Sequence, residues 1–181
     1  MISIINNQNS IVAYFKQDDY DSLIASGVNK RAIEKGGIKL LLEELGYGKD
    51  EIGYKQTGQP CFEDRSGSFL SISHAKGWFA VIIGSEPVGI DIQTQSTRLK
   101  AGQDYFRNEN ELAFFEDETA LHLIWGAKEA FYKLKEGEIP DLKEEVTVLS
   151  ISTDALVIDF KSTEYELKYV LVENAFLVFT V

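Results

Sequence analysis

Three short apolar runs follow one another near the middle of the chain, and tight turns separate them. The runs are SFLSIS at 68–73, WFAVIIG at 78–84 and VGIDIQ at 88–93. Their length, and the Gly, Pro and Ser residues between them, predict three successive β-strands. These strands are the part of the fold that the sequence constrains most.

Helices and further strands flank this central group. Residues 29–45 are predicted as a helix, because apolar residues recur there at helical spacing and Gly46 follows. Gly36 and Gly37 weaken its middle, which either close approach of another helix or a ligand or a different helix boundary would explain. Further helices are predicted over 108–116 and 119–135. Strands are expected within 1–16 and in four runs near the end: EEVTVLSIST, ALVIDF, YELKYVLVE and FLVFTV. Strand groups separated by helices, without βαβ alternation, favour an α+β fold.

The charge and cysteine content narrow the possible partners and the compartment. The 181 residues carry a formal net charge of −11, which disfavours binding to nucleic acid phosphates. The single cysteine, Cys61, excludes an internal disulfide and fits a reducing cytoplasm. The chain shows neither a signal peptide nor an apolar run long enough to span a membrane. We therefore expect a cytoplasmic protein without a membrane partner.

The strand at 88–93 carries a carboxylate between two isoleucines. Because strand side chains alternate, Ile90 and Ile92 point to one face, and Gly89, Asp91 and Gln93 point to the other. The apolar face is typical of core. The other face has room beside Asp91, and we expect a polar or positively charged group to occupy it.

The helix at 119–135 contains a second acidic position. Trp125, Glu129 and Lys133 are spaced at i, i+4 and i+8, so they lie on one stripe of the helix. Taken alone, Glu129 and Lys133 can be explained as a surface ion pair. Ala127, Ala130 and Phe131 make this helix well packed, which weakens that explanation.

Four short motifs occur in an order that resembles the 4′-phosphopantetheinyl transferases, in particular the single-chain, surfactin-type branch with a Trp-x-x-Lys-Glu-Ala motif. They are Gly58-Gln59-Pro60, Ser71-Ile72-Ser73-His74, Gly89-Ile90-Asp91-Ile92-Gln93 and Trp125-Gly126-Ala127-Lys128-Glu129-Ala130-Phe131-Tyr132-Lys133. Each motif is weak alone, whereas four in register are specific. The resemblance covers roughly residues 29 to 135.

The resemblance implies an architecture and a reaction. It implies two similar α+β lobes related by pseudo-twofold symmetry, 1–90 and 91–181, which form one compact monomer with the active site between them. Members of the family transfer the phosphopantetheine arm of coenzyme A to a serine of an apo carrier protein and release adenosine 3′,5′-bisphosphate. Such carriers serve fatty-acid, polyketide or nonribosomal peptide synthesis.

The resemblance also implies the residues that carry the reaction. Asp91, Glu129 and Gln93 are expected to hold Mg²⁺ at the pyrophosphate, with Gln93 as the weaker or outer ligand. Lys133 is expected to offset charge on the leaving group. Glu129, or a metal-bound water, is expected to take the serine proton.

Coenzyme A binding is expected to involve phosphate contacts from the first half of the chain. Ser73 and His74 match positions that hold the 3′-phosphate in relatives. Arg31 is predicted as a further phosphate contact, with Lys30 as its alternative. Gln59 stands where the family usually has a base. It is expected to hydrogen-bond a phosphate without neutralising it, so we expect weaker coenzyme A affinity than in those relatives. Basic residues after the Asp91 strand are expected to contact an acidic carrier protein, unless they are ordinary solvated charges: Arg98, Lys100 and Arg107.

Two other functions remain open from the sequence. Gln59 and Gln93 also fit a non-catalytic homologue that binds coenzyme A or a carrier protein. Alternatively, Asp91 and Glu129 could serve an unrelated Mg²⁺-dependent phosphohydrolase, which would turn over small phosphoesters without a protein acceptor.

Overall fold

The computed structural model describes residues 1–114 and 117–181 and shows the mixed α+β class that the sequence predicts. Within these residues the strands form two antiparallel sheets, one of six strands and one of five. The six-stranded sheet contains, in spatial order, β1 (Ser3–Asn6), β2 (Ser10–Lys16), β6 (Trp78–Gly84), β5 (Phe69–Ala75), β4 (Pro60–Phe62) and β3 (Ile52–Tyr54). The five-stranded sheet contains β7 (Ile90–Thr94), β11 (Ala175–Thr180), β10 (Thr163–Val172), β9 (Ala155–Phe160) and β8 (Val146–Ile151). The chain passes from the first sheet to the second between Gly84 and Ile90.

The two longest predicted helices are present. The helices are α1 (Tyr20–Ala25), α2 (Lys30–Glu44), α3 (Thr97–Ala101), the 3-10 helix η1 (Gln103–Tyr105), α4 (Glu109–Phe114), α5 (Glu118–Leu134) and α6 (Leu142–Glu145). Asn29 begins α2 by accepting hydrogen bonds from two backbone N–H groups, and Asp117 begins α5 in the same way from one. The expected end of the helix at 108–116 lies outside the described residues. None of the helices that the structure describes has the length and apolarity needed to cross a membrane.

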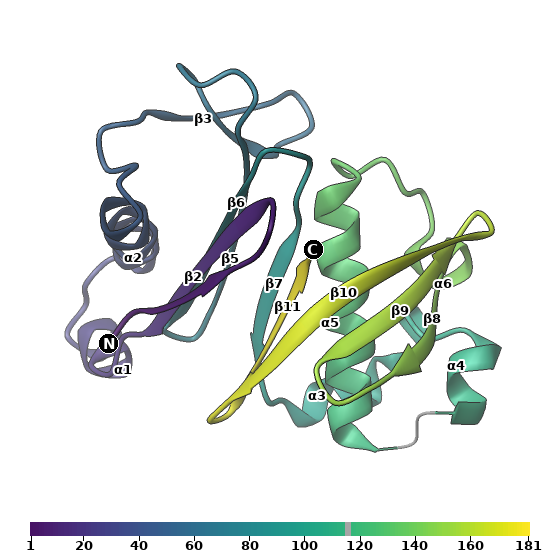
Figure 1. Cartoon of the computed structure of the whole chain (residues 1–181). Helices are drawn as coiled ribbons and strands as arrows, with labels where there is room; N and C mark the ends of the chain where they lie inside the picture. The colour runs from purple at the N-terminus through teal and green to yellow at the C-terminus, as the bar shows by residue number, and fades with distance from the viewer. Residues whose placement is uncertain (115–116) are drawn as a thin grey trace.

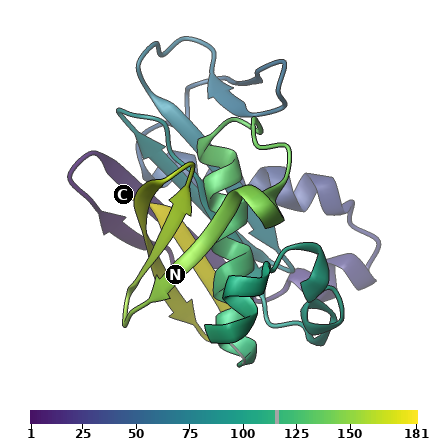
Figure 2. The same cartoon turned by 90° about the vertical axis from the view of Figure 1, so that its right-hand side faces the viewer.

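The molecule is layered, with α2 and α5 on opposite sides of the two sheets (Figure 1). One core lies between α2 and the six-stranded sheet, and another lies between α5 and the five-stranded sheet. A third core joins the two sheets, with Val12, Ala80 and Ile82 from one side and Ile90 and Leu177 from the other. Figure 2, turned by 90°, shows α5 running along the strands of the second sheet. These apolar layers place β7 between the first sheet and α5.

Two glycines allow helices to approach strands closely. A Cβ atom on Gly37 would lie 2.7 Å from the ring of Phe79, so the close neighbour of this glycine is a strand aromatic side chain. A Cβ atom on Gly89 would overlap the backbone carbonyl of Ala130. Gly89 therefore lets α5 lie directly against the chain just before Asp91.

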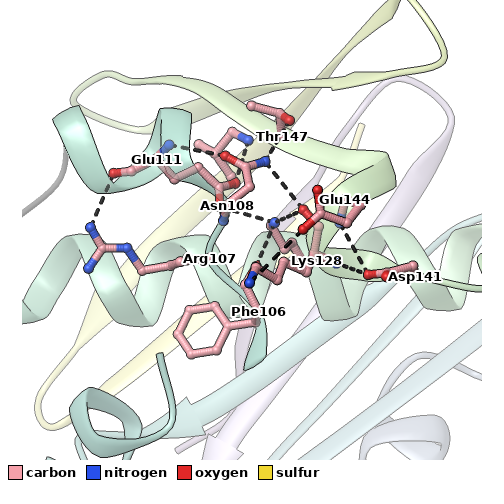
Figure 3. A network of polar contacts seen from close by, with 10 residues as sticks. Phe106, Arg107, Asn108, Glu111, Lys128, Asp141, Glu144 and Thr147 are labelled. Carbon is pink, nitrogen blue, oxygen red and sulfur yellow. Dashed lines mark hydrogen bonds and ion pairs between the residues drawn. The ribbon is translucent and has the colours of Figure 1, made fainter. Parts of the chain in front are cut away.

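A buried ion pair fixes α5 on the side that faces β8 and α4 (Figure 3). Lys128 Nζ lies 3.1 Å from Glu111 Oε2, and both side chains are fully buried. Lys128 also donates to the carbonyl of Phe106 at 2.7 Å, and the Glu111 carboxylate accepts from the N–H groups of Asn108 and Val148. Burial lowers the pKa of Lys128, and the charge of Glu111 opposes that shift. The network holds one side of α5 while Glu129 and Lys133 face β7.

Candidate active site

The strand β7 presents alternate residues to two environments, as the sequence predicts. Ile90 and Ile92 are buried in the core between the sheets. Asp91 contacts Lys133 on α5, and Gln93 contacts the carbonyl of His122 on the same helix. The Asp91 carboxylate, which strand alternation predicts to point away from the core, thus faces α5.

Side chains satisfy the edge of β7 that is not paired with β11. The N–H of Ile90 donates to Ser71 Oγ at 3.3 Å, and the N–H of Ile92 donates to Ser73 Oγ at 3.0 Å. The carbonyl of Ile90 accepts from Lys133 Nζ at 2.8 Å. Buried backbone polar groups need such partners. Along this edge, hydroxyls from β5 and an ammonium from α5 therefore make the hydrogen bonds that a neighbouring strand would otherwise make.

The Asp91 carboxylate has two partners from different elements. Its Oδ1 lies 3.0 Å from Lys133 Nζ and 3.0 Å from the Ser73 hydroxyl, which donates to it. Asp91 is only 7% exposed. The carboxylate is thus held at the junction of β5, β7 and α5.

Glu129 lies one helical turn before Lys133, on the side of α5 that faces Asp91. Burial raises the pKa of Glu129, the negative charge of Asp91 raises it further, and Lys133 opposes the shift. The two carboxylates are close enough to interact, and Glu129 holds a proton more readily than an ordinary glutamate. The explanation of Glu129 and Lys133 as a surface ion pair is wrong, because Lys133 pairs with Asp91 across the helix–strand contact.

Two cavities meet beside Asp91. Asp91 and Lys133 line a cavity of about 410 Å³ together with Tyr54, Ile72 and His74. The last three residues also line a neighbouring cavity of about 430 Å³, which extends along α2. The carboxylate site and the α2 cavity thus share one wall.

The lining of the α2 cavity contains more basic than acidic side chains, although the net charge of the protein is negative; its acidic residues are Glu34 and Asp50. Arg31, Lys35 and Lys39 lie at i, i+4 and i+8 of α2 and all line the cavity. His74 also lines it, with Nδ1 placed 3.4 Å from Glu34 Oε1. The sequence prediction included Arg31 and His74 but missed the other two bases, although their helical spacing was visible.

The two glutamines that depart from the family pattern bind backbone carbonyls. Gln59 Nε2 donates to the carbonyl of Lys133 at 3.1 Å, and Gln93 Nε2 donates to the carbonyl of His122 at 2.8 Å. Gln59 therefore ties the turn before β4 to α5. The expectation that Gln93 is a weak or outer metal ligand stays a prediction.

The basic residues expected at a docking surface fall into two groups. Arg98 and Lys100 are exposed on α3. Arg107 is 4% exposed and donates to Gln103 Oε1 and to the carbonyl of Glu111. The prediction of Arg107 as a docking residue is wrong, because its charge is buried in the network around α4.

The donor atoms at the site fit a hard divalent cation. Asp91 and Glu129 supply two carboxylates, and Mg²⁺ is typically held by one or two carboxylates, waters and phosphate oxygens. In the described part of the chain, no cluster of three or more His, Cys, Asp or Glu side chains is arranged to hold a metal ion. A cation here would therefore depend on water and a phosphate ligand to complete its coordination.

Comparison with known proteins gives two distant relatives. The chain is 27% identical over 126 residues to the 4′-phosphopantetheinyl transferase Sfp of Bacillus subtilis strain 168. It is 26% identical over 128 residues to the 4′-phosphopantetheinyl transferase ffp of Bacillus subtilis. Each match covers 66% of this chain and 54% of the relative, so the chain spans about half the length of the curated relatives it matches. No protein-family model matches the chain. The distant similarity to these two enzymes supports a relationship to the 4′-phosphopantetheinyl transferase superfamily.

Proposed function

We propose that this protein transfers the 4′-phosphopantetheine arm of coenzyme A to a serine of an apo acyl or peptidyl carrier protein, in a Mg²⁺-dependent reaction of the surfactin-type transferases. The observation that carries the proposal is the contact of Asp91 with Lys133 beside Glu129, at the wall of a cavity that adjoins the α2 cavity with its basic side chains. The order of the four motifs and the similarity to Sfp and ffp support the same reaction.

The α2 cavity suits the nucleotide end of coenzyme A. Arg31, Lys35 and Lys39 provide three cationic side chains along one wall, and His74 stands where this cavity meets the carboxylate site. Phosphate groups bind such clusters of bases through charge-assisted hydrogen bonds. A nucleotide held there would extend its pyrophosphate toward Asp91 and Lys133.

The reaction replaces a phosphoanhydride bond of coenzyme A with a phosphodiester bond to the carrier protein. The hydroxyl oxygen of the carrier serine attacks the phosphorus that bears the pantetheine arm, and the bond from this phosphorus to the bridging oxygen breaks. Adenosine 3′,5′-bisphosphate leaves with that oxygen, and the serine proton passes to a base. Reactions of this type are catalysed mostly by positioning and by neutralisation of charge.

The residues at the junction divide these tasks. Glu129, whose pKa is raised by burial, is suited to accept the serine proton directly or through water. Lys133 is suited to offset the charge that grows on the leaving bisphosphate. A Mg²⁺ ion held by Asp91 and Glu129 would neutralise pyrophosphate charge and bring its oxygens into place.

The carrier protein is proposed to dock at α3, which follows β7 in the chain. Carrier proteins are acidic, and so is this chain, so docking depends on a local basic surface. Arg98 and Lys100 on α3 are exposed and follow β7 in the chain. We propose these two residues as contacts for the carrier.

The test is transfer to a panel of apo carrier proteins from fatty-acid, polyketide and nonribosomal peptide systems. Each carrier is incubated with the protein, coenzyme A and Mg²⁺, and its intact mass is then measured. We expect at least one carrier to gain the mass of the phosphopantetheine arm, and to lose this gain when EDTA is added. If no carrier is modified although coenzyme A binds, the chain is a non-catalytic binding homologue.

A further inference from the structure

The strand β5 directs two serine hydroxyls at β7, and the two differ in one contact. Ser71 Oγ accepts from the N–H of Ile90, and Ser73 Oγ accepts from the N–H of Ile92. Ser73 also donates to Asp91 Oδ1 at 3.0 Å. Both serines are buried. They make the same kind of contact with a backbone N–H of β7, but only Ser73 also contacts a carboxylate.

The direction of these hydrogen bonds defines what the Ser73 hydroxyl can do. An ionised carboxylate only accepts hydrogen bonds, so the Ser73 proton must point to Asp91. An oxygen lone pair of the same hydroxyl accepts the N–H of Ile92. A serine hydroxyl has one proton, and Ser73 already donates it in a hydrogen bond to Asp91.

The contacts of Asp91 are uneven between its two oxygens. In the part of the chain that the structure describes, the hydrogen bonds of this carboxylate from Ser73 and Lys133 both end on Oδ1. This arrangement fixes the rotation of the carboxylate and leaves Oδ2 for another ligand. Hydrogen bonds to a ligating carboxylate orient it for its metal ion, and their loss typically costs about 10- to 100-fold in metal affinity or activity.

We propose that Ser73 is a positioning residue that orients Asp91 for a divalent cation, and that it is not a direct phosphate ligand. The inference rests on the proposed function, because it assigns a role to Ser73 within that site. It differs from the role implied by family resemblance, in which Ser73 holds the 3′-phosphate of coenzyme A. The two roles predict different losses when the hydroxyl is removed.

The experiment measures Mn²⁺ binding by electron paramagnetic resonance without a carrier protein but with saturating coenzyme A, which supplies the phosphate ligand that the cation site lacks among the described residues. The variants are Ser73→Ala, Ser73→Cys and the matched control Ser71→Ala, each checked by thermal unfolding. Ser73→Cys keeps the side-chain volume and donates only weakly, so it serves if the alanine variant does not fold. The dissociation constant of coenzyme A is measured on the same proteins.

We expect Ser73→Ala and Ser73→Cys to weaken Mn²⁺ binding by about 10-fold or more, with coenzyme A binding preserved. Ser71→Ala loses the equivalent backbone contact and is expected to keep Mn²⁺ affinity near that of the wild type. Equal losses in Ser71→Ala and Ser73→Ala would show that both serines only join the two sheets. A loss of coenzyme A affinity with unchanged Mn²⁺ binding would assign Ser73 to the phosphate instead.

The same measurements separate this inference from the proposed function. A wild-type protein that binds Mn²⁺ but modifies no carrier contradicts the transferase proposal, while the serine variants still decide the role of Ser73. A wild-type protein that binds no Mn²⁺ overturns the inference itself.

Discussion

The ammonium of Lys133 lies 3.0 Å from Asp91 Oδ1 and 2.8 Å from the carbonyl of Ile90. One side chain of α5 therefore neutralises the carboxylate of β7 and also satisfies the edge of that strand. Glu129, one turn earlier, faces the same carboxylate and has its pKa raised by burial and by Asp91. This contact between a helix and a strand brings two carboxylates and one ammonium together.

Glu129 should make both stability and cation binding depend on pH. Its pKa in the folded chain is raised above the ordinary value of 4.5, so the folded state holds this proton to higher pH than the unfolded state does. The contribution of Glu129 to the free energy of unfolding is then complete below about pH 4.5 and is lost as pH rises through the raised pKa. Mn²⁺ affinity should increase across the same window, because the ion needs the ionised carboxylate.

The measurement compares the wild type with Glu129→Gln in urea unfolding and Mn²⁺ titrations over a range of pH. The stability of the wild type relative to the variant should fall as pH rises. A difference between the two proteins that stays constant with pH would contradict the raised pKa.

The bases along α2 should determine coenzyme A affinity. Arg31→Ala and Lys35→Ala should each raise the dissociation constant of coenzyme A by roughly 10- to 100-fold, since a hydrogen bond to a charged group contributes about 1.5–3 kcal/mol. Lys30→Ala is the matched control: its ammonium lies 3.5 Å from Glu34 Oε1, and Lys30 is not among the residues that line the cavity in the described chain. Isothermal titration calorimetry measures all three. A loss in Lys30→Ala equal to that in Arg31→Ala would show that overall charge, rather than the cavity, controls binding.

Gln59→Lys should tighten coenzyme A binding. The lysine ammonium can still donate to the carbonyl of Lys133, and the change removes the Gln59 Oε1 atom, which is buried without a hydrogen-bond partner among the described residues. The added charge lies near the proposed pyrophosphate path. Gln59→Met is the uncharged control of similar length. An affinity in Gln59→Lys that is unchanged or reduced would refute the idea that this glutamine weakens binding.

The buried pair of Lys128 and Glu111 should show strong coupling in stability. Lys128→Met leaves the Glu111 carboxylate buried without its cation, so it should lower the free energy of unfolding by roughly 3–5 kcal/mol. The double variant Lys128→Met, Glu111→Gln removes both charges and should recover most of this loss. Urea unfolding at neutral pH measures each variant. If the losses of the two single variants simply add in the double variant, the two residues do not act as a pair.

The sequence predicts the parts of the site that depend on periodicity. Strand alternation places Asp91 on the face opposite Ile90 and Ile92, and helical spacing places Glu129 and Lys133 on one stripe. The structure shows both arrangements. Helical spacing does not reveal which neighbour one face of a helix contacts. The sequence therefore left open a surface ion pair between Glu129 and Lys133, whereas the packing of α5 against β7 pairs Lys133 with Asp91.

Other features depend on tertiary contacts that local pattern does not contain. Ser71 and Ser73 satisfy N–H groups that are 19 residues away in the chain, and their role follows from the edge of β7 lying beside β5. Arg107 is a charged residue next to the polar Asn108 and Glu109 in sequence, and yet its side chain is buried beside α4. The strands β3 and β4 have three residues each, too few to show a period.

The most direct test of the account is whether Asp91 supports cation-dependent transfer. Asp91→Asn keeps the shape of the side chain but removes the charge that pairs with Lys133 and, in the account, with Mg²⁺. With an apo carrier that the wild type modifies, intact mass spectrometry should show transfer reduced by more than about 100-fold, since the loss of indirect ligand contacts alone costs about 10- to 100-fold. Circular dichroism should show a folded protein with both sheets. Full transfer by a folded Asp91→Asn variant would contradict the assignment of Asp91, and with it the proposed site.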